Sequence, residues 1–509
     1  MLKDKLLITF KFFILWLGFA WYAGIFDHLH ELPRGVHQGA QCDRASLAQN
    51  YYYGGMNFLY PEVNEDRCID GIVSCELPLT PYLSAALYQL FGYDEIWFRL
   101  LSFALFSLGM FALFLLFKTQ MNQLNALLLV ITIQCSPILM FYAANFIPDI
   151  SALGLSLIAV FLFFKLHIKH TYLPNYSSPW WNLLFIVSIS LSIASKTTNL
   201  IHWLSMAGLI LFSFFPASNI HIVNRKKAIY GLLLALIMPA IWYLWSKHLG
   251  QTHNFQYFMM RIPWSETWES YQSAWLVYLA NWPQQTFSEP LIFIVFGLIV
   301  VALCLKRYTS NALWYLTLFN FLGSLAFLFV MIEQFKYHDY YIICLFPVFA
   351  LSWLLLAEAS KKISSKFWYL KIVAFLLIVW AFFFQSNGGL INLRERYTEG
   401  NYWDQSSVQP NRYDTLRQML IARNINRNTC VIAGYDPTPN NILYLLHLRG
   451  HRYSKEHDSE RLNYIVNGAH PQYLISNSRQ LDSAVNQLVD MKFELEYREL
   501  KVFKLIHKP

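Results

Sequence analysis

Long apolar runs alternate with short polar segments from the start of the chain to about residue 388. The hydrocarbon core of a bilayer is roughly 30 Å thick, so a helix of about 20 apolar residues can cross it. The pattern predicts eleven spans, near 6–26, 96–117, 124–143, 150–166, 181–195, 199–215, 228–246, 289–305, 312–332, 340–358 and 367–385. Residues 1–388 are therefore expected to form an all-α membrane domain.

The polar, turn-rich stretch 389–509 has a different pattern. Its predicted elements alternate along the chain: a helix in "TLRQMLIARNI", a strand in "CVIAGY", a helix in "NNILYLLHLRG", a strand in "QYLISN", a helix in "AVNQLVDM" and a hairpin in "FELEYRELKVFKLI". Such alternation indicates a small soluble α/β domain. In the loop 27–95, "CDRASLAQNYYYGG" and "LPLTPYLSAALYQLFG" have helical apolar spacing, which predicts interfacial helices.

The basic residues between the apolar runs indicate an orientation. If the spans alternate, all of the following fall on one side: Lys3, Lys5, Lys118, Lys165, Lys169, Arg225, Lys226, Lys227, Lys306, Arg307, Lys361, Lys362 and Lys366. Cytoplasmic loops carry the excess of Lys and Arg. We therefore expect a cytoplasmic N-terminus, with 27–95, 247–288, 333–339 and the tail on the opposite, non-cytoplasmic side.

Composition agrees with an integral membrane protein. The 509 residues are 56% hydrophobic and only 14% charged, whereas soluble domains carry about 25% charged residues. The net charge of +8 comes from short clusters between apolar runs, so it does not indicate a nucleic-acid partner.

Seven cysteines are present, at positions 42, 68, 75, 135, 304, 344 and 430. None has the paired spacing of a zinc site. Cys68 and Cys75 share one hydrophilic loop, and in an oxidising compartment they could pair as a disulfide; two free thiols are the alternative.

Three acidic residues recur at outer ends of the apolar runs. Asp43 begins an amphipathic segment, where it is either a helix N-cap or a catalytic carboxylate. Glu76 precedes two prolines in "CELPLTPY" and is either a solvated loop acid or part of a site. Asp149 follows Pro148 at the start of a span, where a cap and a site role are compatible.

Cationic and aromatic residues lie at the same boundary. Lys196 interrupts the positive-inside pattern between two apolar runs, which an anionic ligand, a pair with Asp149, or snorkelling to the headgroups would explain. Arg261 is either a second anion contact or an interfacial anchor, and His338 either a site residue or a structural one. Tyr340 lies beside His338 in "EQFKYHDYYI".

Acids and cations at one lipid–water boundary suit a reaction on an amphiphile with an anionic head. Cations bind a phosphate and stabilise it as a leaving group, while a carboxylate can deprotonate an attacking hydroxyl or amine. The chain has no Walker loop, GxGxxG, GxSxG or HExxH motif. It also has no compact ligand set, so no cofactor is expected and a divalent metal, although possible, is not predicted.

Four segments of the chain resemble the dolichyl-phosphate-mannose–protein mannosyltransferase superfamily. They are "HQGAQCDRASLAQNYYYGGMNFLYP", "CELPLTPYLSAALYQLFG", the "PD" that opens one span and the "HDYY" that opens another. The likeness is closest to its bacterial branch, which includes the aminoarabinose transferase of lipid A. It extends over about residues 30–200 and returns at 333–347.

This resemblance implies a C-type glycosyltransferase fold and a polyprenyl-phosphate-linked sugar donor. Asp43 would take the place of the family's base, and Glu76 that of the second loop acid. The lipid A enzymes carry a lysine after that glutamate, where this chain has Leu77, so the acceptor stays open. The mannosyltransferases carry an acid pair at the first motif, where this chain has Arg44 beside Asp43.

The resulting hypothesis is an inverting transferase of the bacterial inner membrane that acts on a lipid, glycan or protein acceptor. Asp43, Glu76 and Asp149 are the expected catalytic acids. The expected donor-phosphate ligands are Lys196, Arg44, Arg261, His338 and Tyr340. A transporter or flippase whose path uses the same residues is the alternative, although such proteins often show internal repeats. An inactive lipid-binding scaffold is a third possibility.

Overall fold

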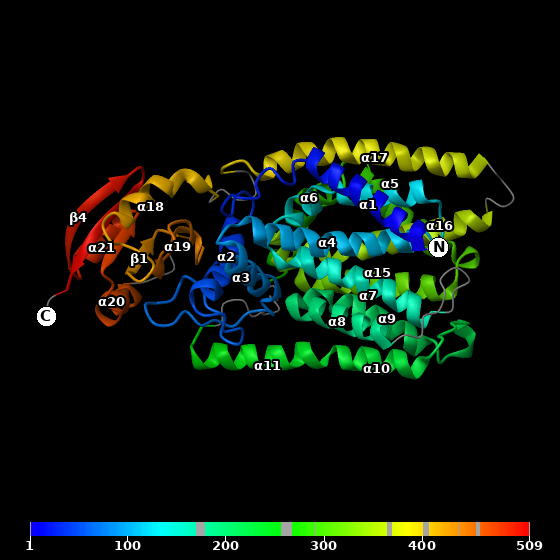
Figure 1. Ribbon diagram of the computed structural model, residues 1–509, viewed down its shortest axis with the longest axis horizontal. Coiled ribbons are helices and arrows are strands. Elements are labelled where there is room, and N and C mark those ends of the chain that lie inside the picture. Colours follow the sequence, from blue (N-terminus) through cyan, green and yellow to red (C-terminus); the bar gives the residue numbers. More distant parts are fainter. Residues whose placement is uncertain are drawn as a thin grey trace.

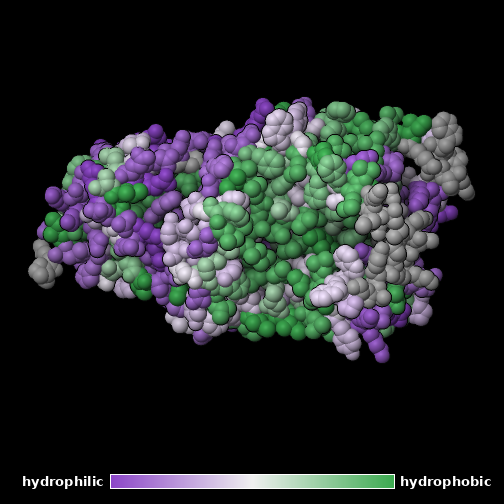
Figure 2. Space-filling view, in the orientation of Figure 1, coloured by the Kyte–Doolittle hydropathy of each residue, from purple (hydrophilic) through white to green (hydrophobic). Residues whose placement is uncertain are grey.

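A long helical bundle carries a small α/β domain at one end, opposite the end where the N-terminus lies (Figure 1). The computed structural model describes residues 2–168, 179–255, 267–289, 291–363, 369–400, 407–436, 438–454 and 459–507. Apolar side chains cover the visible face of the bundle, and hydrophilic ones dominate the α/β domain (Figure 2). This surface is the one expected of a membrane protein with an extramembrane domain.

The bundle contains fifteen α-helices among the described residues. They are α1 (Leu2–Tyr22), α4 (Ile96–Phe117), α5 (Gln123–Gln134), α6 (Pro137–Ala143), α7 (Pro148–His167), α8 (Pro179–Ser195), α9 (Leu200–Phe212), α10 (Arg225–Ala235), α11 (Ile237–Thr252), α12 (Trp268–Asn281), α13 (Pro283–Thr286), α14 (Leu291–Cys304), α15 (Asn311–Met331), α16 (Phe346–Ile363) and α17 (Tyr369–Arg396). Most of the predicted apolar runs therefore form helices.

Six continuous helical segments are long and apolar enough to cross a membrane: Ile96–Phe117, Pro148–His167, Arg225–Thr252, Asn311–Lys336, Asp339–Ile363 and Phe375–Arg396. Two further pairs are bent, and three apolar helices are shorter. The membrane character is thus confirmed, while the count of eleven spans stays a prediction.

The run 124–143 is not the single straight span that its composition predicts. It bends by 82° between α5 and α6, because Pro137 has no backbone N–H to continue the helix. By contrast, α4 and α7 approach closely: a Cβ added to Gly109 would collide with the backbone of Gly154. Small residues at such a crossing allow the helix backbones to meet.

The first outer loop forms α2 (Gln38–Tyr53) and α3 (Leu79–Phe91), as the apolar spacing predicts. However, α2 is buried along nearly its whole length, so it is a core element under the C-terminal domain and not a surface helix. Its first residue follows His37, whose φ is 57°.

The C-terminal domain has a five-stranded sheet in the order β2-β1-β3-β5-β4. The strands are β1 (Cys430–Gly434), β2 (Arg449–Tyr453), β3 (Tyr473–Ser476), β4 (Asp490–Tyr497) and β5 (Leu500–Ile506). Its helices are α18 (Asp414–Ile421), α19 (Asn441–Leu445), α20 (Ser459–Gly468) and α21 (Arg479–Asn486). β1 pairs in parallel with β2 and β3, whereas β5 pairs antiparallel with β3 and β4. The α/β class and the terminal hairpin are confirmed.

Two predicted helices of this domain have the wrong bounds. The stretch 484–491 is helical only as far as Asn486, the end of α21, and β4 begins at Asp490. The apolar stretch 440–450 forms only the short α19, and β2 follows it. His447 takes a φ of 55° between the two elements. Gly450 then lets β2 lie against β1, where a Cβ would collide with the carbonyl oxygen of Val431. The predicted boundary between the domains at residue 388 falls within α17, and it stays a prediction.

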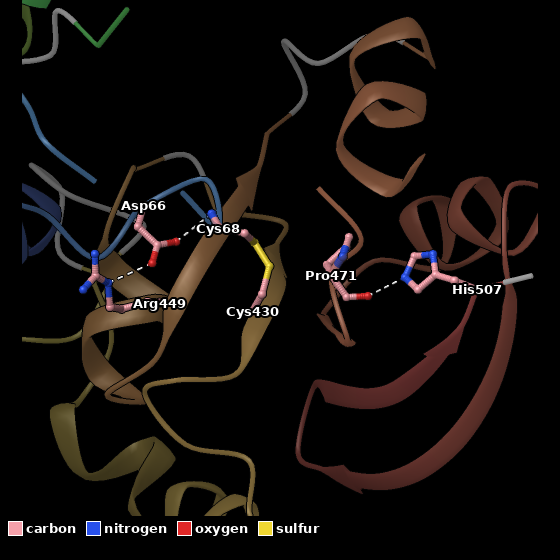
Figure 3. Close-up of a disulfide and its surroundings, with 6 residues drawn as sticks. All are labelled: Asp66, Cys68, Cys430, Arg449, Pro471 and His507. Carbon is pink, nitrogen blue, oxygen red and sulfur yellow. Dashed lines mark hydrogen bonds and ion pairs between the residues drawn. A yellow bond between two sulfur atoms is a disulfide. The ribbon is translucent and has the colours of Figure 1, made fainter. Parts of the chain in front are cut away.

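A disulfide joins the first outer loop to the start of β1 (Figure 3). The bond links Cys68 to Cys430, with their Cα atoms 5.4 Å apart. Cys75, which the sequence offered as a possible partner of Cys68, is a buried free thiol. Neither alternative is therefore right, the Cys68–Cys75 disulfide or the pair of free thiols: the loop packs against a strand 362 residues away, a proximity that local spacing does not encode.

Candidate functional site

A line of alternating charge crosses the junction between the bundle and α2. Asp43 Oδ2 lies 3.7 Å from Arg44 Nη1, and Arg44 Nη2 lies 3.6 Å from Glu76 Oε1. Lys196 Nζ lies 3.5 Å from the same Glu76 oxygen and 3.3 Å from Asp149 Oδ2. We call these five residues the site cluster. Three acids and two cations, predicted separately from the sequence, therefore meet in one place.

Asp43 is buried inside α2, with 5% of its surface exposed. The N-cap position belongs to His37, so the capping alternative for Asp43 is wrong. Its Oδ1 accepts a hydrogen bond of 2.9 Å from the side chain of Asn440. Burial raises the pKa of Asp43 to about 6, although Arg44 and Asn440 each act to lower it. A base whose pKa lies near neutral pH is well matched to general-base catalysis.

Backbone contacts hold Glu76 at the centre of the line. The carbonyl of Cys75 accepts hydrogen bonds from Trp242 Nε1 and from the hydroxyl of Ser246. On the other side, the N–H of Leu77 donates to the carbonyl of Ala194 at 2.9 Å. The segment before the two prolines is thus fixed between α8 and α11, which excludes a freely solvated loop acid at this position.

Asp149 and Lys196 are paired at the ends of two apolar helices. Asp149 lies in the first turn of α7, after the N-cap Ile147, so its carboxylate is not the cap. Lys196 is the residue before the short 3-10 helix Thr197–Asn199, and only 3% of its surface is exposed. The charge is therefore buried and paired with Asp149, which excludes the snorkelling alternative.

Aromatic rings surround the Lys196 ammonium. Nζ lies 5.2 Å from the ring centroid of Tyr340 and 4.7 Å from that of Tyr341, within the range of cation–π attraction. His338 stacks on Tyr340 with the ring centroids 5.2 Å apart. Tyr340 and His338 therefore lie beside the site cluster, as expected, whereas Arg261 falls outside the described residues.

A second group of buried charges adjoins α2. Asp339 accepts hydrogen bonds from Arg396 Nη2 at 2.6 Å and from the Tyr142 hydroxyl at 2.7 Å, and His37 Nε2 lies 3.1 Å from it. Arg396 also donates from Nε to Gln285 at 3.0 Å. We call Asp339, Arg396, Tyr142 and His37 the Asp339 cluster. Asp339 follows His338 in "EQFKYHDYYI", but the sequence pattern indicated no role for Asp339 or for its three partners.

The site cluster is separate from the apolar crevice at the other end of the bundle. This crevice of about 1030 Å³ lies among α5, α14, α16 and α17, with Lys118 and Lys361 at its edge. Its walls are mainly aliphatic and aromatic, so it suits lipid chains and not ionic chemistry. In the described ranges, no three His, Cys, Asp or Glu side chains form a group that could hold a metal ion.

The helical bundle with a small α/β domain over one end has the fold of C-type glycosyltransferases of known structure. Residues 76–245 match the family model described as dolichyl-phosphate-mannose-protein mannosyltransferase. The expected fold is thereby confirmed.

Solved structures give the particular likeness. ArnT from Cupriavidus metallidurans in the apo state superposes with a TM-score of 0.65 at 11% identity, over 97% of this chain and 98% of that one. ArnT bound to undecaprenyl phosphate gives 0.63, with the same identity and coverage. The apo oligosaccharyltransferase of Archaeoglobus fulgidus gives 0.53 at 11% identity, over 94% of this chain and 73% of that one. No curated protein matches by sequence.

Proposed function

We propose that this protein is a membrane glycosyltransferase that moves a sugar from a polyprenyl-phosphate donor to an acceptor on the non-cytoplasmic face. The observation that carries the proposal is the site cluster, in which two cations and three acids meet at one end of a C-type glycosyltransferase fold. One of the ArnT structures with this fold is bound to undecaprenyl phosphate.

In the proposed reaction, Asp43 accepts the proton of an acceptor hydroxyl or amine. The acceptor heteroatom then attacks the sugar C1, and the bond between C1 and the phosphate oxygen breaks. The electron pair leaves with the polyprenyl phosphate, and attack opposite to the leaving group inverts the configuration at C1. Lys196 and Arg44 balance the negative charge that develops on the phosphate.

Glu76 and Asp149 hold these two cations in place. Glu76 Oε1 lies within 3.6 Å of both the Arg44 guanidinium and the Lys196 ammonium. Asp149 pairs with Lys196 from the other side at 3.3 Å. We assign both acids as positioning residues, with Tyr340 and His338 forming the wall beside Lys196. Arg261 stays a candidate phosphate ligand from the sequence alone.

The Cys68–Cys430 disulfide supports a non-cytoplasmic location for the first outer loop and the C-terminal domain, because structural disulfides persist in oxidising compartments. Together with the basic clusters, it favours a cytoplasmic N-terminus. The fold shared with ArnT of Cupriavidus metallidurans favours the bacterial inner membrane. The acceptor class, a lipid, glycan or protein, is left open.

Purified protein in lipid vesicles, supplied with a labelled undecaprenyl-phosphate sugar, tests the proposal. Transfer predicts label on an acceptor, in a reaction that continues after divalent ions are chelated. Movement of intact donor across the bilayer would instead establish a flippase. Label that neither moves nor transfers would contradict both, and would favour a binding scaffold.

Asp43→Asn identifies the base in the same assay. General-base assistance is worth roughly 10²–10⁴ in rate, so the variant is expected to lose that factor while it keeps its fold. Asp27→Asn, at an exposed carboxylate just after α1, is the matched control and keeps the parental rate. Parental transfer by Asp43→Asn would refute the assignment of the base.

A further inference from the structure

The C-terminal domain places one side chain directly on the presumed base. Asn440, fully buried before α19, donates from Nδ2 to Asp43 Oδ1 at 2.9 Å. Its Oδ1 accepts the backbone N–H of Glu65 at 2.7 Å. Because that oxygen faces a backbone donor, the amide nitrogen has to face the carboxylate. The orientation is therefore fixed by both ends of the side chain.

The segment that carries Asn440 is itself tightly built. Asp436 accepts hydrogen bonds from the N–H and hydroxyl of Thr438 through Oδ1, and from the N–H of Ile442 through Oδ2. Thr438 packs against α2 at Gly39, where an added Cβ would collide with the threonine methyl. Gly39 therefore permits the close approach that brings Asn440 to Asp43.

The disulfide anchors the same strand from its other end. Cys430 is the first residue of β1 and is bonded to Cys68 of the first outer loop, while Asp436 follows the end of β1. Arg449 of β2 adds an ion pair to Asp66 in that loop at 2.8 Å (Figure 3). The first outer loop, before α3, therefore helps to fix the position of Asn440, in addition to the contacts within the C-terminal domain.

We propose that Asn440 is a positioning residue for Asp43, through which the C-terminal domain completes the active site. This inference rests on the proposed function. The hydrogen bond orients one carboxylate oxygen and leaves Oδ2, on the side of Arg44, to receive the acceptor proton. The α/β domain is accordingly part of the catalytic unit.

The hydrogen bond also affects the pH below which kcat/KM falls, the acid limb of the pH profile. A donor that bonds the ionised carboxylate favours that form, so its loss raises the pKa of Asp43. The other charged groups that act on Asp43 are Arg44 of α2, with Glu76 beyond it, and Asp436 and Arg452 of the C-terminal domain. These stay in place when Asn440 is changed.

Asn440→Ala is expected to lower kcat roughly tenfold, the rate equivalent of one charge-assisted hydrogen bond. The donor KM is expected to stay at the parental value. The acid limb of kcat/KM should move upward by about one pH unit, since one unit corresponds to a bond of that strength. Asn440→Asp keeps the size but replaces the donor with an acid, so it should move the limb at least as far.

Asn441→Ala is the matched control, because Asn441 is the adjacent buried amide and contacts Cys42 Sγ instead of Asp43. It should leave the acid limb unchanged. An equal shift in Asn441→Ala, or none in folded Asn440→Ala and Asn440→Asp, would overturn the proposal.

Thermal unfolding separates this inference from the proposed function. Asn440→Ala should change the pH dependence of Tm between about pH 4 and 7 in the parent, and should not do so in an Asp43→Asn background. This coupling is measurable even if no sugar is transferred. The same pH dependence of Tm in both backgrounds would refute a link between Asn440 and Asp43, whatever the protein transfers.

Discussion

Two groups of buried charge adjoin α2, and the distances between the charged atoms within each group differ. In the site cluster the four ion pairs measure 3.3–3.7 Å. In the Asp339 cluster the contacts to the carboxylate measure 2.6–3.1 Å. Charge-assisted hydrogen bonds are shortest and strongest at about 2.7–2.9 Å. Both oxygens of the Asp339 carboxylate are therefore held by short contacts, whereas the charges of the site cluster lie near one another without forming short bonds.

This difference indicates different roles. Removing one member of a completed buried pair leaves an uncompensated charge, so such a pair maintains the fold. Charges arranged at longer distances can exchange partners when a phosphate arrives, at a smaller cost. In this protein the Asp339 cluster ties the start of α2 to the end of α17, which is consistent with the catalytic role that we propose for the site cluster alone.

Asp339→Asn should have the largest effect on stability. It keeps the shape but removes the counter-charge of Arg396, which is fully buried. Breaking such a pair costs roughly 3–5 kcal/mol. Thermal unfolding in detergent should show a large drop in Tm, while Asp490→Asn, at an exposed carboxylate of β4, should not. If the Tm of Asp339→Asn matches that of the control, the Asp339 cluster does not support the fold more than the site cluster does.

Asp43→Asn should raise the stability of the fold, whereas Asp339→Asn should lower it. Burial raises the pKa of Asp43 from 3.8 to about 6, so the folded protein binds a proton more tightly than the unfolded chain. The ionised carboxylate therefore destabilises the fold above that pKa, and the cost disappears below the unfolded value of 3.8. A shift of about two units corresponds to roughly 3 kcal/mol.

The measurement is Tm of Asp43→Asn against the parent from pH 4 to pH 8. The variant should be the more stable at pH 8, and the gain should shrink to nothing near pH 4. The amide oxygen introduced by the substitution can still accept the hydrogen bond of Asn440, so the contact between the domains is kept. A variant that is less stable than the parent at pH 8 would mean that Asp43, like Asp339, supports the fold.

The sequence was informative about the site cluster for a physical reason. Ionisable residues beside apolar runs are costly in a membrane protein, so Asp43, Glu76, Asp149 and Lys196 are conspicuous against their neighbours. The positive-inside pattern further singled out Lys196. All of these signals could be read from the sequence without knowing the fold.

The missing parts depend on contacts between distant segments. Asn440 is a neutral amide 397 residues from Asp43, and nothing in "DPTPNN" indicates a carboxylate partner. The cysteine pairing failed for the same reason, because Cys430 is close to Cys68 in space and far from it in sequence. The arginine-bearing end of α17, "NLRER", likewise gave no sign that Arg396 would meet Asp339.

Glu76→Gln should have the smallest effect on stability and gives the sharpest comparison with Asp339→Asn. Glu76 lies between two cations, and each has a second acid: Arg44 has Asp43 at 3.7 Å and Lys196 has Asp149 at 3.3 Å. Its own pairs are long, and 16% of its side chain is exposed. In Glu76→Gln, two acids remain for the two cations, so each cation keeps a carboxylate partner.

The free energy of unfolding of Glu76→Gln should therefore stay within about 1 kcal/mol of the parent. Both substitutions replace a carboxylate with its amide beside an arginine. The difference between their Tm values therefore isolates the effect of short contacts to the carboxylate as against long ion pairs. If Glu76→Gln unfolds as readily as Asp339→Asn, the site cluster is as rigid as its neighbour. Its cations would then stay paired with the acids, and other residues would have to bind the phosphate.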